Sequence, residues 1–220
     1  MQEYRLKGIF ADKRNFYTKN LVPGRQVYGE LLVKEGGVEY RQWDSKRSKL
    51  GAALAKGISQ IGLKPDSVVL YLGAATGTTV SHVSDIIGKT GHAFALDFSP
   101  RVLRDLVFVA EERKNISPVL ADANQPYSYI HLVPEVDFIF QDVAQRNQIE
   151  IFLKNIDLYL KEGGFAAIAL KARSVDVSKK PSVIFEAAKK ELEKHVTIVD
   201  YRTLEPFEKD HAFFVCKKTK

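Results

Sequence analysis

The stretch Ser67–Thr79 reads SVVLYLGAATGTT and decides the fold. The apolar run Val68–Leu72 predicts a buried strand, and Gly73 and Gly77 allow a sharp turn before a helix that begins near Thr78. Such a strand, turn and helix is the first unit of a doubly wound α/β sheet. The stretch therefore predicts a mainly parallel sheet with a ligand site at the carboxyl ends of its strands.

Strands and helices continue to alternate after this stretch. Further strands are expected at Gly91–Asp97, Pro118–Leu120, Val136–Phe140, Gly164–Lys171, Val196–Tyr201 and Ala212–Cys216, and helices at about 78–88, 100–114, 146–161 and 181–194. The segment Thr203–Asp210 leaves no room for a crossover helix, so the last two strands should pair antiparallel. The predicted fold is a Rossmann-like sheet with an antiparallel terminal strand.

The residues before this sheet have a different pattern. Strands are expected at Gly8–Tyr17, Val27–Lys34 and Val38–Trp43, the last two forming a hairpin, and a helix is expected over 48–61. Three or four short strands are too few for an ordinary domain, so this sheet should pack on the rest of the chain. We therefore predict a small N-terminal antiparallel β domain over 1–47 and an α/β domain over 48–220.

The composition excludes several classes of protein. With 220 residues, of which 45% are hydrophobic and 27% charged, the chain can bury a core of its own. No apolar run approaches the roughly 20 residues of a membrane span, and the charged N-terminus does not resemble a signal peptide. The single cysteine, Cys216, excludes an internal disulfide and, with no clustered histidines, a structural metal site. We expect a cytoplasmic protein without a bound metal.

The positive charge lies at the front of the chain. Residues 1–50 hold 11 Lys and Arg against 6 Asp and Glu, whereas the remaining residues are nearly balanced. A basic segment beside a nearly neutral domain favours a surface that faces a polyanion. A solvated face that only aids solubility has the same pattern, and charge alone leaves both interpretations open.

The predicted ligand site suits an adenosine that carries an anionic tail. The spacing Gly-x-x-x-Gly differs from the dinucleotide fingerprint, which disfavours a nicotinamide cofactor. Asp97 follows the second strand and can bind ribose hydroxyls, Phe98 can stack on a purine, and Asp122 and Asn124 can accept from its amino group. S-adenosylmethionine fits these features. Its predicted binding residues are Gly73, Ala74, Ala75, Thr76, Gly77, Thr78, Thr79, Asp97, Phe98, Asp122, Ala123 and Asp142.

Several motifs together resemble the fibrillarin family in its short archaeal form. They occur in the family's order over nearly the whole chain: Tyr40–Trp43, Arg47–Leu50, Leu70–Thr79, Ser81–Val83, Asp142–Gln145, Lys171–Asp176 and Glu205–His211. The resemblance implies an S-adenosylmethionine-dependent RNA 2′-O-methyltransferase that acts on rRNA and tRNA and is guided by box C/D RNA. One departure is Asp97, which stands where relatives often have Glu; the shorter side chain should still reach a ribose.

The resemblance also implies an active site of Lys49, Asp142, Lys171 and His211. A ribose 2′-hydroxyl is a poor nucleophile at neutral pH, so methyl transfer requires orientation and removal of a proton. Lys171 is the candidate to deprotonate or polarise this hydroxyl. Asp142 is expected to orient Lys171 and to lie near the sulfonium, while Lys49 and His211 position the ribose and the adjoining phosphate.

The sequence has no recognisable module for reading bases, so target choice is expected to come from other molecules. By resemblance, these are the guide RNA, a Nop-domain scaffold protein and a kink-turn-binding protein of ribosomal type. The Lys and Arg residues around 41–49 are expected to contact RNA backbone. Two alternatives stay open, namely a non-catalytic RNA-binding assembly subunit and a methyltransferase that acts on another acceptor.

Overall fold

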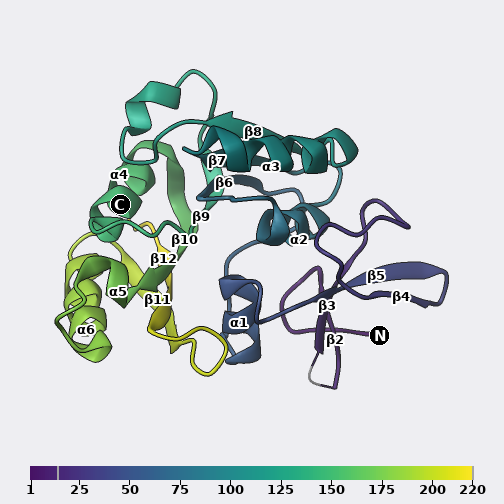
Figure 1. Ribbon diagram of the computed structural model, residues 1–220, viewed down its shortest axis with the longest axis horizontal. Coiled ribbons are helices and arrows are strands. Elements are labelled where there is room, and N and C mark those ends of the chain that lie inside the picture. Colours follow the sequence, from purple (N-terminus) through teal and green to yellow (C-terminus); the bar gives the residue numbers. More distant parts are fainter. Residues whose placement is uncertain (14, 220) are drawn as a thin grey trace.

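The computed structural model describes residues 1–13 and 15–219, and in them the chain forms two sheets (Figure 1). The N-terminal sheet has the strand order β1-β2-β3-β5-β4, and the large sheet has the order β11-β12-β10-β9-β6-β7-β8. Figure 1 shows the N-terminal sheet at one end of the molecule, beside α1 and α2. The predicted boundary at residue 47 lies in the turn between β5 and α1.

The N-terminal sheet differs in two places from its prediction. Its strands are β1 (Gln2–Glu3), β2 (Ile9–Asp12), β3 (Asn15–Lys19), β4 (Leu32–Glu35) and β5 (Val38–Trp43). The single strand expected over Gly8–Tyr17 is a hairpin, because the chain turns near Lys13, which has φ 55°. The strand expected from Val27 begins only at Leu32, because the Glu30 carboxylate accepts from the N–H groups of Val27 and Tyr28 and holds a turn.

The large sheet confirms the predicted fold class. Its strands are β6 (Val68–Leu72), β7 (His92–Asp97), β8 (Ile116–Leu120), β9 (Val136–Gln141), β10 (Leu160–Lys171), β11 (Thr197–Thr203) and β12 (His211–Lys217). β10, β9, β6, β7 and β8 run parallel to one another, whereas β12 runs antiparallel to its two neighbours, β10 and β11. The carboxyl ends of the central strands therefore share one edge with the start of β12.

Helices cover both faces of this sheet. They are α1 (Lys49–Ala55), α2 (Thr78–Ile87), α3 (Pro100–Glu112), α4 (Gln148–Tyr159), α5 (Ala172–Val175) and α6 (Pro181–Leu192), and a 3₁₀ turn, η1, spans Pro126–Tyr129. The helix expected over 48–61 ends early, because Gly57 has φ 75° and leaves the helical conformation. Ile58 and Ile61 are nevertheless buried, so the apolar spacing predicted their burial but not the length of the helix.

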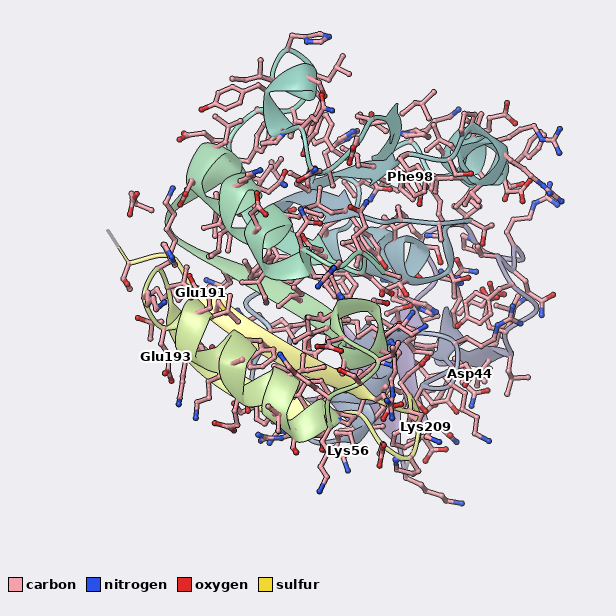
Figure 2. The ribbon with its side chains drawn as sticks, turned by 60° about the vertical axis from the view of Figure 1, so that its left-hand side comes forward. Asp44, Lys56, Phe98, Glu191, Glu193 and Lys209 are labelled. Carbon is pink, nitrogen blue, oxygen red and sulfur yellow. The ribbon has the colours of Figure 1, made fainter. Side chains whose placement is uncertain are left out.

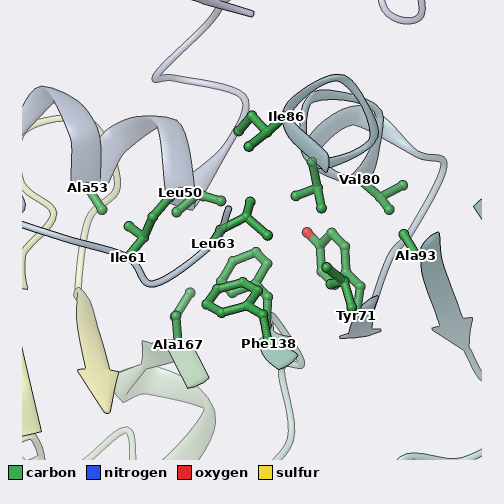
Figure 3. Close-up of a cluster of buried hydrophobic side chains, with 14 of the residues drawn as sticks. Leu50, Ala53, Ile61, Leu63, Tyr71, Val80, Ile86, Ala93, Phe138 and Ala167 are labelled. Atoms are coloured by element: carbon green, nitrogen blue, oxygen red, sulfur yellow. The ribbon is translucent and has the colours of Figure 1, made fainter. Parts of the chain in front are cut away.

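The two faces have separate apolar cores. Side chains of α1 and α2 pack with Tyr71, Phe138 and Ala167 on one face, as Figure 3 shows. On the other face, α4 and α6 pack against Leu70 and Ile168. Successive side chains of a strand point to opposite faces of the sheet. A strand residue that belongs to one core therefore has sequence neighbours whose side chains lie on the opposite face. In residues 1–13 and 15–219, no helix is long and apolar enough to cross a membrane.

A buried charge cluster joins the N-terminal sheet to α2. The Asp85 carboxylate accepts from Arg41 Nη1 at 2.8 Å, from Arg113 Nη1 at 2.6 Å and from the Thr18 hydroxyl at 2.7 Å. Arg41 also donates through Nε to Glu30 at 2.6 Å. Arginine is rarely buried unless it is paired, and here both guanidinium groups have carboxylate partners. The cluster connects β3 and β5 with α2 and with the end of α3.

His82 lies beside this cluster on α2. Its ring stacks on Trp43 with 4.7 Å between centroids, and its two nitrogens lie 2.8 Å from the Thr18 hydroxyl and 2.7 Å from the Tyr28 hydroxyl. Thr18 donates its hydrogen to Asp85, so its oxygen accepts from His82 Nδ1–H. Burial, and then the charge of Arg41, hold the pKa of His82 well below 6.5, so the buried ring is neutral.

Replacing Asp85 tests whether the charge cluster fixes the N-terminal sheet. We expect Asp85→Asn to lower the free energy of unfolding by about 3–5 kcal/mol, because it leaves the buried Arg113 guanidinium without a charged partner and leaves Arg41 with Glu30 alone. The exposed pair of Arg25 and Glu112 provides a control, and Glu112→Gln should change the free energy by less than about 1 kcal/mol. Urea unfolding measures both values, and equal effects of the two substitutions would contradict this role.

The neutral state of His82 predicts a loss of stability in acid. Below pH 6.5 the unfolded chain takes up a proton at His82 that the folded protein does not, so the free energy of unfolding falls as pH falls. Until the folded pKa is reached, this group contributes a loss of about 1.4 kcal/mol per pH unit. Unfolding at pH 7.5 and 5.5 should show a smaller loss for His82→Gln than for the wild type. An identical loss would contradict the assignment.

Candidate functional site

The candidate site forms where the ends of β9 and β10 meet the start of β12. Lys171 ends β10 and lies directly opposite His211, the first residue of β12, in the antiparallel register. Asp142 follows β9, and its N–H donates to the Leu72 carbonyl of β6 at 2.9 Å. Residues opposite one another in an antiparallel pair have their Cβ atoms about 4.5–5.5 Å apart. The fold thus brings together residues that lie far apart in the sequence.

The alternation of the strands places these side chains on the α1 face. In β9, Phe138 and Phe140 belong to the core beneath α1, and Asp142 follows at the same two-residue spacing. In β10, Ala167 and Ala169 belong to that core, and Lys171 is next in the series. His211 likewise shares its face of β12 with Phe213 and Val215. The predicted groups therefore converge on one side of the sheet.

Lys49 reaches the same place from α1. Ser48 caps this helix by accepting from the N–H of Gly51 at 3.1 Å, and Lys49 is the first helical residue. Lys49 Nζ lies 3.1 Å from Asp142 Oδ2, and the two side chains are 28% and 19% exposed. The ion pair is thus accessible to a substrate. It differs from the expected contact between Asp142 and Lys171, because α1 lies over the end of β9 and delivers Lys49 to the carboxylate.

Lys171 and His211 present groups that can bind and move a proton. In the described part of the chain, Lys171 Nζ has no hydrogen-bond or ion-pair partner. His211 Nδ1 lies 2.7 Å from the Lys209 carbonyl, which can only accept, so Nδ1 carries a proton and a neutral ring keeps Nε2 as an acceptor. Together with the pair of Lys49 and Asp142, these groups can position a hydroxyl and an adjoining phosphate.

The glycine turn after β6 packs directly against the end of β9. Gly73 has φ 82°, and a Cβ atom on it would overlap the carbonyl oxygen of Asp142 and lie 3.1 Å from Val143. The next part of the turn is held by Asp97, whose Oδ2 accepts from the N–H of Ala75 and whose Oδ1 accepts from the N–H of Ser99, both at 3.0 Å. Only glycine at position 73 allows the turn and Asp142 to lie so close.

A cavity of about 510 Å³ lies between this turn and the ends of β7, β8 and β9. Six predicted cofactor residues line it, namely Gly73, Ala75, Asp97, Phe98, Ala123 and Asp142. Leu96, Ala121, Val143, Ala144 and Gln145 complete the lining, and these five were not predicted from the sequence as cofactor residues. Most of their side chains are apolar and carry no chemical signal, although the position of Val143–Gln145 directly after Asp142 could have indicated them.

The other predicted cofactor residues lie around this cavity without lining it. Thr79 is buried, and its hydroxyl donates to Ser48 Oγ at 3.0 Å. Thr76 and Thr78 line a neighbouring cavity of about 470 Å³ together with Arg47 and Phe108. The remaining ones are Ala74, Gly77 and Asp122, of which Ala74 is buried and Asp122 accepts from the N–H of Asn124 at 2.9 Å. The hydrogen bond between Thr79 and Ser48 connects the glycine turn with the helix that carries Lys49.

The residues of the cavity fit the predicted S-adenosylmethionine. The volume of the cavity lies within the usual range of roughly 300–1,000 Å³ for small-molecule sites. The missing Cβ of Gly73 leaves space beside Asp142. Phe98, labelled in Figure 2, is 69% exposed and lines the cavity, where its ring can cover a purine. In residues 1–13 and 15–219, no three His, Cys, Asp or Glu side chains gather as a metal site requires.

The structure corrects one part of the predicted RNA-binding surface. Arg41 was expected to contact RNA backbone with the other basic residues up to position 49, but its guanidinium is wholly buried between Glu30 and Asp85. Lys46 and Arg47 are exposed and remain available to a phosphate. The sequence alone did not separate these residues, because burial of an arginine depends on acidic partners that lie far along the chain.

Comparisons with known proteins agree over the full chain. The family model named Fibrillarin matches residues 1–220. The fibrillarin-like rRNA/tRNA 2′-O-methyltransferase of Pyrococcus horikoshii is 54% identical over 224 residues, which cover 100% of this chain and 99% of that protein. Aeropyrum pernix fibrillarin with natively bound S-adenosyl-L-methionine is 43% identical with a TM-score of 0.89, covering 98% and 96%. A chain of a fibrillarin/Nop5p complex is 39% identical with a TM-score of 0.90, covering 98% and 100%.

A methyl group on Gly73 tests the packing of the glycine turn. We expect Gly73→Ala to weaken S-adenosylmethionine binding at least about tenfold, equivalent to about 1.4 kcal/mol, because the turn must move away from Asp142. Gly163 has a similar φ of 73° with open space around it, so Gly163→Ala carries the backbone strain without the overlap. Calorimetric titration should give wild-type affinity for the control. Equal affinities of the two variants would contradict this role of Gly73.

Proposed function

This chain belongs to the fibrillarin family, and we propose that it transfers methyl groups from S-adenosylmethionine to ribose 2′-hydroxyls of rRNA and tRNA. The observation that carries the proposal is the convergence of Lys49, Asp142, Lys171 and His211 at the edge of a cavity that fits the cofactor. The names of the relatives and the cofactor held by the Aeropyrum pernix protein support it.

The cavity residues divide the binding of the cofactor among them. Asp97, although held by two N–H groups of the turn, keeps acceptor positions for the ribose hydroxyls, because a carboxylate has about four such positions. We assign Phe98 and Ala123 of the lining, with the neighbouring Asp122, to the purine, and the glycine turn to the carboxylate of the methionine part. Thr79 takes no part in this contact, because its hydroxyl is buried and donates to Ser48. When bound, S-adenosylmethionine supplies an electrophilic methyl group beside Asp142.

The four polar residues then act on the acceptor RNA. Lys171 contacts the 2′-hydroxyl and polarises or deprotonates it, which raises its nucleophilicity. Asp142 stabilises the positive charge of the sulfonium. Through its ion pair, it also holds Lys49 at the site. Lys49 and His211 bind the ribose and the adjoining phosphate, so the attacking oxygen is held in line with the methyl group.

Target choice is assigned to partners of the enzyme. The solved fibrillarin/Nop5p complex supports a Nop-domain scaffold protein as one partner. We further propose a box C/D guide RNA, which selects the nucleotide by base pairing, and a kink-turn-binding protein of ribosomal type. Exposed cations beside the site, Lys46 and Arg47 among them, contact the RNA backbone without reading its sequence.

Methyl transfer from labelled S-adenosylmethionine to a target RNA tests the proposal. We expect transfer when the protein is combined with guide RNA and the two partner proteins, and little or none with the protein alone. Asp142→Ala and Lys171→Ala should each lower kcat by at least about 100-fold, whereas Lys190→Ala on the exposed side of α6 should have no effect.

The competing outcomes are distinct. No transfer by a verified assembly that binds S-adenosylmethionine would favour a non-catalytic assembly subunit. Efficient methylation of a small molecule by the protein alone would favour a different acceptor. Near-normal transfer by a folded Lys171→Ala protein would show that the catalytic assignment of this lysine is wrong.

A further inference from the structure

Lys171 ends β10 at a point where β10 is no longer paired with β9. The parallel pairing between β10 and β9 ends with Ile168 opposite Gln141, three residues before Lys171. β9 itself ends at Gln141, and the N–H of Asp142 bonds on the other side, to the Leu72 carbonyl of β6. On its β9 side, the backbone of Lys171 therefore has no strand to bond to.

The side chain of Gln148 occupies the place of the missing strand. Its Oε1 accepts from the N–H of Lys171 at 3.1 Å, and its Nε2 donates to the Lys171 carbonyl at 3.1 Å. A glutamine amide has the same acceptor and donor as a peptide group, so it extends the hydrogen-bond ladder of β10 by one residue. Gln148 is the first residue of α4 and is wholly buried.

A second buried glutamine connects this contact to the end of β9. Gln141 Nε2 donates to the Gln148 carbonyl at 2.7 Å, and Gln141 directly precedes Asp142. In the described part of the chain, Gln141 Oε1 is buried without a hydrogen-bond partner, so the contact to Gln148 is what holds its amide. The two glutamines thus link the residue before Asp142 with the backbone of Lys171.

We propose that Gln148 is a positioning residue that sets the place of Lys171 relative to Asp142. It acts from α4, on the face of the sheet opposite the reacting groups, and its complete burial keeps it out of reach of a substrate. The other edge of Lys171 remains paired with β12, since Lys171 lies in register with His211 and the N–H of Ala172 donates to the Asp210 carbonyl. Loss of the Gln148 amide therefore releases Lys171 locally and leaves β10 in the sheet.

This inference rests on the proposed function, since it matters only if Lys171 contacts the acceptor hydroxyl. Catalytic geometry tolerates small errors poorly, and a displacement of about 1 Å can lower a rate about 100-fold. The expected effect of releasing Lys171 is therefore on kcat. The affinities for S-adenosylmethionine and RNA should change little, because Gln148 does not line the cofactor cavity.

Variants of Gln148 and matched controls test the proposal in the assembled enzyme with guide RNA and partner proteins. Gln148→Met removes both hydrogen bonds with an unbranched side chain of similar length, and we expect kcat to fall about 10–100-fold with KM within about threefold. Asn115→Leu is the matched control, because it removes another buried amide, bonded to the carbonyls of Ser84 and Gly88 far from Lys171. It should lower Tm and leave kcat unchanged.

In Gln148→Glu, the pH dependence of kcat distinguishes a positioning role from a merely structural one. A protonated carboxyl group has the acceptor and the donor that Lys171 requires, whereas the ionised form has only acceptors and repels the Lys171 carbonyl. The kcat of Gln148→Glu relative to the wild type should therefore be highest at low pH and fall as pH rises. A ratio that does not change with pH overturns the proposal.

The control Lys171→Ala separates this inference from the proposed function. If Lys171→Ala retains kcat, the proposed role of Lys171 fails and the positioning role fails with it. If Lys171→Ala is inactive while a folded Gln148→Met protein has a kcat within twofold of the wild type, only the positioning role is overturned. Should Gln148→Met not fold, the pH dependence of Gln148→Glu decides.

Discussion

The rest of the structure depends on the two buried ion pairs that Asp85 makes with Arg41 and Arg113. Arg41 belongs to the N-terminal sheet, Arg113 follows α3, and Asp85 lies on α2, so one carboxylate fixes three parts of the chain. The glycine turn leads directly into α2, and α1 follows the N-terminal sheet after a short turn. The cofactor turn and the helix that carries Lys49 are therefore held by the same anchor. The hydrogen bond between Thr79 and Ser48 joins them again close to the site.

The two faces of the large sheet have different tasks at its carboxyl edge. Asp142, Lys171 and His211 project on the α1 face, where Lys49 joins them. On the α4 face, Gln141 and Gln148 bond to backbone groups instead of substrate. Strand alternation makes this division possible, because neighbours in sequence such as Gln141 and Asp142 point to opposite sides. A reactive group can thus be exposed to RNA while its support remains buried.

The sequence predicted the alternating strands and helices, the glycine turn and the strand-end residues, because these follow from local patterns of apolar residues and glycine. The convergence of Lys49 with Asp142 came from the resemblance, since no local pattern relates α1 to the end of β9. The ends of elements were less accurate, as the early end of α1 at Gly57 shows. The burial of Arg41 and the contacts of Gln148 could not be predicted, because both depend on partners that only the folded chain brings together.

In the proposed mechanism, this chain performs the chemistry, and base pairing between other molecules selects the target. The most direct test shifts the guide RNA by one nucleotide along the same target and maps the methylated position in the product by mass spectrometry. We predict that the methyl group moves by one nucleotide and stays on the ribose 2′-oxygen. A methyl group that remains at a fixed sequence, or that lies on a base, would contradict the mechanism.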